Sequence, residues 1–216
     1  MTLKVITLKS NNKFYPENLK TIQNPPERLY ILGNVLKKDE LAIAIVGSRR
    51  MTSYGKKMAY KFSFELARKG ITIVSGLALG IDTIAHKAAI AAHGRTIAVL
   101  GSGIDVIYPP QNKKLAEEII KNGALISEFP LGTKPLGKNF LVRNRIISGL
   151  AKAILVVEGG RVSGTISTAT WAANQGKEVF AIPGSLDSPM SQATNYLISQ
   201  GANIATKPED IIEILK

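Results

Sequence analysis

Short apolar runs alternate with longer helix-compatible stretches along most of this 216-residue chain. The apolar runs are continuous, which is typical of strands that are covered on both faces. A glycine precedes most of them, and glycine favours the left-handed backbone conformation that often follows the end of a helix. Regular alternation of strand and helix favours a parallel sheet with right-handed crossovers. We therefore predict an α/β fold with a doubly wound, mostly parallel sheet and helices on both faces.

The boundaries of the expected elements follow from the same pattern. The predicted strands occupy residues 42–46, 71–74, 96–100, 124–127, 153–157, 178–182 and, more briefly, 203–205. The predicted helices occupy residues 54–68, 83–92, 113–121, 140–150, 165–174, 195–199 and 208–215. Residues 1–40 have few apolar runs and contain two consecutive prolines. We expect them to form an N-terminal arm packed on a core domain of residues 41–216.

The charge of the chain is strongly positive. Lys and Arg number 28 against 16 Asp and Glu, which gives a formal net charge of +12. Such an excess favours a polyanionic partner, although a generally basic surface kept for solubility is the alternative interpretation. The chain has no cysteine and two histidines, which excludes disulfides and thiolate zinc sites and argues against an imidazole-rich metal site. We expect neither a metal nor a cofactor.

No segment of the sequence resembles a targeting signal or a membrane span. The N-terminus lacks an apolar signal core, and no apolar run approaches the ~20 residues that a membrane-spanning helix needs. We therefore expect a cytoplasmic protein that has no association with membranes.

Glycine follows most of the predicted strands within two residues. In a doubly wound sheet, ligands bind outside the carboxyl ends of the strands, so these loops together define the candidate site. Glycine allows a backbone to approach a ligand closely, although tight turns need it as well. Arginines are interleaved with the glycines in Gly47-Ser48-Arg49-Arg50 and in the loop at 159–165. The combination predicts a broad phosphate-binding face.

Residues 134–165 contain the densest group of candidate ligand-binding side chains. A predicted helix with Arg143 and Arg145 leads into a buried strand, and that strand ends in a loop that opens the helix at Thr165. The start of a helix offers unpaired backbone N–H groups and a positive dipole end to an anion. No general base stands beside a nucleophile in this segment. The pattern indicates phosphate binding rather than catalysis.

A dinucleotide site is a weaker alternative. Gly101-Ser102-Gly103 begins like the dinucleotide fingerprint, but Val106 occupies its sixth position and a proline pair follows where a helix would start. No strand loop ends in Gly-Lys followed by Ser or Thr, so a P-loop ATPase is also unsupported.

Several motifs follow one another along the chain. They are Pro25-Pro26-Glu27-Arg28-Leu29-Tyr30-Ile31-Leu32-Gly33-Asn34, Ile45-Val46-Gly47-Ser48-Arg49, Ser75-Gly76-Leu77-Ala78-Leu79-Gly80-Ile81-Asp82, Gly101-Ser102-Gly103-Ile104-Asp105, Ser163-Gly164-Thr165 and Ala181-Ile182-Pro183-Gly184. In this unbroken order, from about Tyr15 to the last helix, the chain resembles the DNA-processing protein A (DprA/Smf) family. The resemblance implies an extended Rossmann-like fold that binds and protects single-stranded DNA and helps to load the RecA recombinase in natural transformation. It implies no catalysis. Family members often carry a helical domain before the core and a winged-helix domain after it, and we expect neither here.

The resemblance also implies a set of DNA-binding residues. They are Gly47, Ser48, Arg49 and Arg50 in the first loop, Lys138, Phe140, Arg143, Asn144 and Arg145 in the helix region, and Ser163, Gly164 and Thr165 in the last loop. Arg143 and Arg145 cannot share one face of a helix, so we expect at most one to point at DNA and the other to pair with Glu158 or Glu128. Phe140 could stack on a base or could be a buried hydrophobe at the start of the helix.

The same resemblance favours a homodimer that forms through the C-terminal half. An apolar pattern at residues 196–198, 204 and 211–215 could provide that interface or could seal the core.

The main enzymatic alternative is a nucleotide phosphoribohydrolase of the lysine-decarboxylase-like (LOG) type. Those enzymes have a Gly-Gly-x-Gly-Thr loop that is followed closely by a catalytic glutamate. Here Ile166-Ser167-Thr168 follows the loop, and no carboxylate is present. We therefore predict a protein that is not an enzyme.

Overall fold

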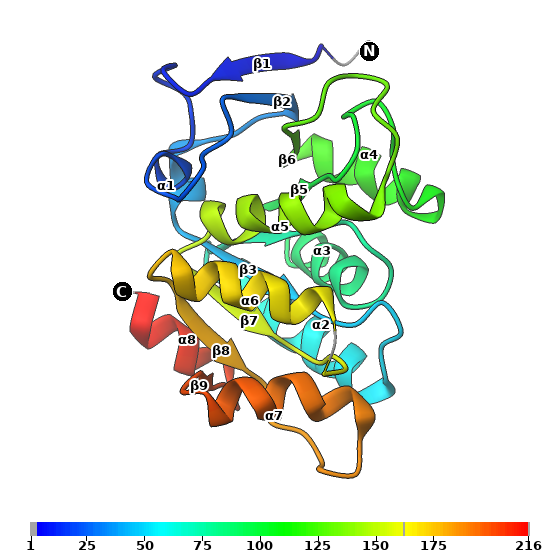
Figure 1. Cartoon of the computed structure of the whole chain (residues 1–216), viewed down its shortest axis with the longest axis vertical. Coiled ribbons are helices and arrows are strands. Elements are labelled where there is room, and N and C mark those ends of the chain that lie inside the picture. The colour runs from blue at the N-terminus through cyan, green and yellow to red at the C-terminus, as the bar shows by residue number, and fades with distance from the viewer. Residues whose placement is uncertain (1–3, 162, 216) are drawn as a thin grey trace.

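The computed structural model describes residues 4–161 and 163–215 and contains one sheet of nine strands in the order β1-β2-β6-β5-β4-β3-β7-β8-β9 (Figure 1). The strands are β1 (Ile6–Lys9), β2 (Arg28–Gly33), β3 (Ala42–Val46), β4 (Thr72–Ser75), β5 (Thr96–Val99), β6 (Ala124–Ser127), β7 (Ala153–Val156), β8 (Glu178–Ala181) and β9 (Asn203–Ile204). The seven neighbouring strands from β6 to β9 in this order pair in parallel. Strand β2 pairs antiparallel with β6, and β1 pairs antiparallel with β2. The predicted fold class is confirmed.

Eight α-helices and three 3-10 helices connect the strands in the described part of the chain. They are α1 (Glu17–Lys20), η1 (Lys37–Glu40), α2 (Ser53–Arg68), α3 (Ile81–Ala91), η2 (Pro110–Asn112), α4 (Lys113–Lys121), α5 (Gly137–Leu150), α6 (Gly164–Asn174), η3 (Pro189–Ser191), α7 (Gln192–Ser199) and α8 (Pro208–Leu215). Most predicted boundaries agree with the structure within one or two residues. Helices α5 and α7 each begin three residues earlier than predicted.

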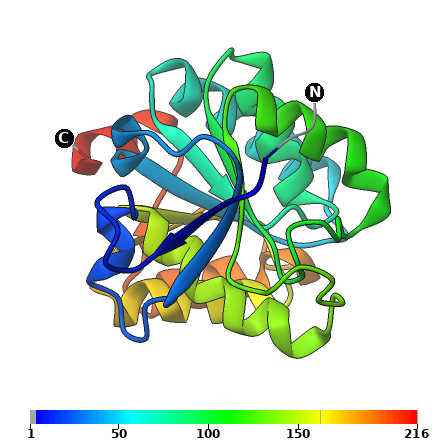
Figure 2. The same ribbon diagram turned by 90° about the horizontal axis from the view of Figure 1, so that it is seen from above.

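The helices form one layer on each face of the sheet (Figure 2). Apolar side chains of α1, α5 and α6 pack in one core cluster with alternate residues of the sheet, such as Ala44 and Ile154. The strand residues that alternate with these, such as Ile43 and Leu155, pack in a second cluster with side chains of α2, α3 and α8. Side chains of α4 belong to a third cluster. Because both faces are covered, all residues of the central strands are buried.

The N-terminal segment contributes two strands to the sheet rather than lying against the domain as an extended arm. Strand β2 pairs antiparallel with β6, with Leu32 opposite Leu125, and β1 pairs antiparallel with β2. Tyr15 and Leu19 are buried in the same cluster as α5. In β2, buried and partly exposed positions alternate along the first residues, because a strand near the edge is not fully covered on both faces. Residues 1–3 of the expected arm lie outside the described residues.

Within the described residues, no helix combines the length and the hydropathy that a membrane span requires.

Candidate functional site

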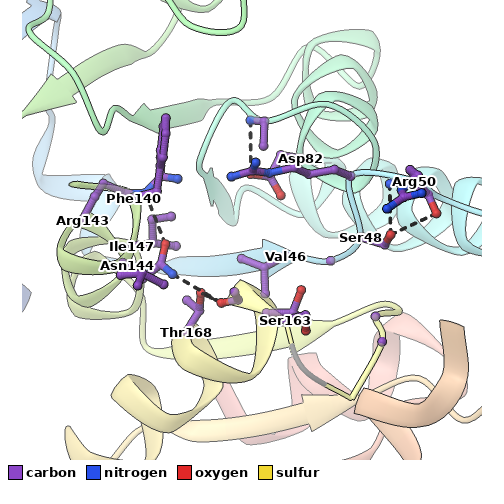
Figure 3. A pocket seen from close by; sticks show the side chains of 18 of the residues that line it. Val46, Ser48, Arg50, Asp82, Phe140, Arg143, Asn144, Ile147, Ser163 and Thr168 are labelled. Atoms are coloured by element: carbon purple, nitrogen blue, oxygen red, sulfur yellow. Dashed lines mark hydrogen bonds between the residues drawn. The ribbon is translucent and has the colours of Figure 1, made fainter. Parts of the chain in front are cut away.

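A cavity of about 890 Å³ lies at the carboxyl ends of β3 and β7 (Figure 3). These neighbouring strands lead to opposite layers: β3 is followed by α2 and β7 by α6, which pack in different core clusters. This position is the topological switch point of the sheet, where doubly wound folds bind their ligands. The cavity brings together ten of the twelve residues predicted for the site, namely Gly47, Ser48, Arg49, Arg50, Phe140, Arg143, Asn144, Ser163, Gly164 and Thr165.

Hydrogen bonds and close packing hold the loop after β3 in place. Ser48 Oγ accepts a hydrogen bond of 3.0 Å from the Arg50 N–H, and the Ser48 N–H donates to Glu158 O at 2.9 Å. Gly80 packs against the loop with a φ of +79°, and a Cβ at this position would come within 2.2 Å of Ser48 O. A glycine is therefore required there. The loop is fixed while Arg49 and Arg50 line the cavity.

Phe140 forms the aromatic part of the cavity wall. The guanidinium carbon of Arg49 lies 5.5 Å from the ring centroid, and that of Arg143 lies 5.7 Å from it, so both have cation–π geometry. The Tyr108 ring contacts Phe140 at a centroid distance of 5.7 Å. Phe140 is half-buried and lines the cavity, so its ring is not sealed inside the core as a helix-start hydrophobe would be.

Arg143 lies in the floor of the cavity and is only 4% exposed. Its Nη1 donates to Gly76 O at 2.8 Å and also to Val99 O, at the ends of two neighbouring strands. Burial lowers its pKa to about 10, although the nearby Asp82 carboxylate acts in the opposite direction. Arg143 is therefore still charged at neutral pH. It adds positive potential to the cavity, while its Nη1 is used to tie the strand ends together.

Arg145 lies on the other side of α5 and does not line the cavity. It forms a two-pronged ion pair with Glu128, with Nη1–Oε1 and Nη2–Oε2 distances of 2.5 and 2.6 Å, and its Nε donates to Asn24 O. The helix spacing had predicted this division, since one arginine faces the cavity and the other pairs with Glu128. The DNA contact expected of Arg145 stays a prediction: its side chain does not line the cavity, because this buried ion pair holds it elsewhere.

The N-terminus of α6 forms the wall opposite Phe140. Asn144 Nδ2 and Thr168 Oγ1 both donate to Gly164 O, at 3.3 and 3.0 Å, which fixes the first turn of the helix against α5. The first N–H groups of a helix have no partner within that helix. Ser163 Oγ is buried and has no hydrogen-bond partner among the described residues. This end of α6 can therefore hold an anion such as a phosphate group.

Lys138 does not line the cavity either. It is exposed on the first turn of α5, between Gly137 and Phe140, which do line it. Its four-carbon side chain is therefore at the rim of the cavity rather than within it.

The carboxylates near the cavity are engaged in structural hydrogen bonds. Glu158 accepts from the Thr52 N–H at 2.8 Å and from Thr52 Oγ1 at 2.7 Å, at the N-terminus of α2. Asp82 accepts from the N–H groups of Gly76 and Ala78, and burial raises its pKa. Neither side chain is placed as a general base beside a nucleophile.

Neither His86 nor a group of metal ligands offers a reactive centre among the described residues. His86 is buried, its Nδ1 lies 2.6 Å from Thr96 Oγ1, and burial lowers its pKa to about 3, so the ring is neutral at physiological pH. The described residues contain no group of three His, Asp or Glu side chains that could hold a metal ion.

Twelve further residues line the cavity that were not predicted individually to bind DNA, although Gly159 and Gly160 belong to the loop at 159–165 that was expected in the phosphate-binding face. The set comprises Val46, Ala78, Asp82, Tyr108, Pro135, Gly137, Leu141, Ile147, Gly159, Gly160, Thr168 and Met190. Tyr108 could have been found, because it follows the loop after β5 at the same edge of the sheet. Met190 gave no signal, because it reaches the site through η3, where its carbonyl accepts from the Gly159 N–H at 2.7 Å.

Comparisons with known proteins identify the family. The family model for DNA recombination-mediator protein A matches residues 4–216. Protein Smf of Escherichia coli is 45% identical over 208 residues, which cover 96% of this chain and 56% of that protein. DNA processing protein DprA of Bacillus subtilis is 46% identical over 210 residues, which cover 97% of this chain and 71% of that protein. The chain thus spans 56% and 71% of the lengths of these two relatives.

Solved structures agree with this assignment. DNA processing protein A from Streptococcus pneumoniae has a TM-score of 0.90 at 38% identity, covering 97% of this chain and 74% of that one. The Helicobacter pylori protein, described for its single-stranded DNA binding mode, has a TM-score of 0.87 at 33% identity, covering 99% and 96%. A molybdenum cofactor binding protein from Rippkaea orientalis, at 21% identity and a TM-score of 0.58 over 81% of this chain and 94% of that one, shares the fold alone. The resemblance inferred from the motifs is confirmed, and the chain belongs to the DNA recombination-mediator protein A family.

Proposed function

We propose that this chain binds single-stranded DNA in the cavity between the loop after β3, α5 and the N-terminus of α6. The observation that carries the proposal is the Arg49 guanidinium over the Phe140 ring, opposite the start of α6. Proteins that hold single strands combine a cationic groove for the phosphates with aromatic surfaces for the bases. The single-stranded DNA binding mode described for the related Helicobacter pylori protein supports the same assignment.

The charges around the cavity suit a polyanion. Arg49, Arg50 and Arg143 line it, and Lys138 lies at its rim. The Glu158 and Asp82 carboxylates accept hydrogen bonds from backbone N–H groups of the surrounding loops, which reduces their repulsion of a phosphate. Three arginines thus line the cavity against one carboxylate, that of Asp82.

Membership of the family supports a wider role. We propose that the chain acts in the cytoplasm, protects incoming single strands and helps to load the RecA recombinase during natural transformation. We also propose that it forms a homodimer through its C-terminal half. Tyr196, Ile204 and Ile214 support the dimer, because these large apolar side chains are 41–53% exposed on α7, β9 and α8.

The chain is expected to prefer single-stranded to duplex DNA with little dependence on sequence. The cavity offers a ring, cations and backbone N–H groups but no helix placed to enter a major groove. Fluorescence anisotropy with a labelled oligonucleotide, single-stranded or annealed, at two salt concentrations measures this preference. The log–log salt slope should be roughly −0.7 for each phosphate contacted. Equal affinity for the duplex, or binding that salt does not weaken, would refute the proposal.

We further propose that the chain turns over no nucleotide or DNA substrate. Purified protein should not hydrolyse nucleoside monophosphates, ATP or DNA. The decisive variant is Glu158→Gln, because Glu158 is the carboxylate at the end of β7. We expect it to cost about 1 kcal/mol of stability through a weaker α2 N-terminus and to remove no activity. Glu117→Gln, on the exposed side of α4, is the matched control. Hydrolysis by the parent that Glu158→Gln abolishes, while Glu117→Gln retains it, would establish an enzyme instead.

A further inference from the structure

The outer face of α2 presents aromatic and basic side chains together. Lys56 and Lys57 precede Tyr60 by four and three residues, and Phe64 follows it by four. Residues three or four apart lie on one face of a helix, so these four side chains are neighbours, with Lys61 beside them. We call these five residues the α2 face. The opposite face of the helix is buried against the core through Ala59, Phe62, Ser63, Leu66 and Ala67.

The two rings of the α2 face form an ordered pair at the surface. The Tyr60 and Phe64 centroids are 5.8 Å apart, and the ring planes differ by 14°. Tyr60 is 47% exposed and Phe64 is half-buried. Packing of this helix on the core does not account for an exposed ring at this position. A stacked pair of nearly parallel rings is a suitable surface for an unpaired base.

The lysines of the α2 face carry uncompensated charge. Lys56, Lys57 and Lys61 are all exposed, and none forms an ion pair with another described residue. The acidic residue of the helix, Glu65, is paired with Arg68 at 2.7 Å. The α2 face is therefore positively charged around its rings, which matches a polyanion better than an uncharged apolar partner.

The α2 face lies on the helix that begins next to the cavity in the sequence. Arg50 lines the cavity, and α2 begins three residues later at Ser53. The start of α2 therefore lies on the side of the cavity where Ser48 and Arg50 lie (Figure 3). At 1.5 Å per residue, Lys56 and Lys57 lie about 5 and 6 Å from the start of the helix, and Tyr60 and Lys61 lie about 11 and 12 Å from it. A strand that leaves the cavity past Arg50 meets Lys56 and Lys57 first, and then Tyr60 and Lys61.

We propose that the α2 face is a second segment of the single-strand surface, which holds the strand after it leaves the cavity. The lysines contact phosphates, and a base stacks on the exposed Tyr60 ring, with Phe64 supporting that ring from behind. Both contacts are independent of base identity. The inference rests on the proposed function, since it takes the occupant of the cavity to be single-stranded DNA.

Oligonucleotide length separates the α2 face from the cavity. A strand of roughly 6 nucleotides is near the smaller site sizes of single-strand binders, and one of roughly 25 nucleotides exceeds them. We compare a triple variant, Lys56→Ala with Lys57→Ala and Lys61→Ala, against a charge-matched triple variant on α4, Lys113→Ala with Lys114→Ala and Lys121→Ala. A third protein carries Tyr60→Ala alone. Circular dichroism melts verify that each variant is folded.

The α2 triple variant should bind the short strand like the parent but the long strand roughly 10-fold more weakly. Its salt slope on the long strand should be smaller by roughly 2, since three phosphate contacts at about 0.7 each are lost. Tyr60→Ala should weaken long-strand binding at least about 5-fold, the lower limit for one stacked base, without changing the salt slope. The α4 variant should bind both strands like the parent.

Two results would overturn the inference. One is equal long-strand affinity for the α2 and α4 variants, which would leave the α2 face free for another partner such as an acidic protein surface. The other is an equal loss on both strands, which would show that the changes act on the cavity. Failure of the parent to bind the short strand would instead refute the proposed function of the cavity, and long-strand binding would still test the α2 face.

Discussion

Replacing Arg49 by alanine is expected to weaken single-strand binding by about 1–2 kcal/mol, or roughly 5- to 30-fold, which is the range for one charge-assisted contact. The Arg49 guanidinium lines the cavity over the Phe140 ring, so the change removes both a phosphate partner and a cation–π contact. Lys138→Ala is expected to fall in the same range, with its charge lost from the rim. Titrations of both variants at two salt concentrations should also show smaller salt slopes than the parent.

The control for both changes is Arg28→Ala, which removes an exposed charge from β2, a strand that does not line the cavity. Arg28→Ala should bind single strands with the affinity of the parent, because the position of a positive charge affects binding more than the total charge of the protein does. Thermal melts are needed beside the titrations to show that the folds are intact. If Arg49→Ala and Lys138→Ala both melt normally and bind with parental affinity, the DNA-binding surface lies elsewhere.

The parallel part of the sheet could be predicted because burial on both faces leaves a simple pattern. Residues 42–46 are five consecutive apolar side chains, and all five are buried in β3. Strands β1 and β2 could not be found in this way. Most residues of β1 are exposed, buried and partly exposed residues alternate along the start of β2, and the two prolines between these strands suggested an extended arm. Such strands are defined by what they pair with, and the pairing of β2 with β6 joins residues almost a hundred positions apart.

The location of the site also followed from the sequence, because topology gathers the loops after parallel strands at one edge. The direction in which each side chain points could not be predicted from the topology. Helix spacing separated Arg143 from Arg145, but nothing local showed which one faces the cavity. That depends on Glu128, which lies in the loop after β6 and pairs with Arg145. Tyr108 was missed for a similar reason, since its contact with Phe140 exists only when the loop after β5 and α5 are both in place.

Arg145→Ala is expected to reduce the free energy of unfolding by about 3 kcal/mol. The side chains of Arg145 and Glu128 are 10% and 16% exposed, so loss of the guanidinium leaves a carboxylate that is largely buried and has lost its partner. The change also removes the Nε donor to Asn24 O, which links α5 to the N-terminal segment. Urea denaturation of the parent and the variant measures the difference. Residual folded protein should still bind single strands, because Arg145 does not line the cavity.

A double variant, Arg145→Met with Glu128→Leu, distinguishes a structural ion pair from a DNA contact. Replacing both partners by apolar side chains removes the buried charges together, so it should recover much of the stability that Arg145→Ala loses. If Arg145 acts only through Glu128, the double variant keeps the single-strand affinity of the parent. If it instead binds weakly at parental stability, Arg145 contacts DNA after leaving Glu128. DNA binding would then break the ion pair, because a phosphate would replace Glu128 as the partner of Arg145. The binding surface would extend along α5 towards the N-terminal segment.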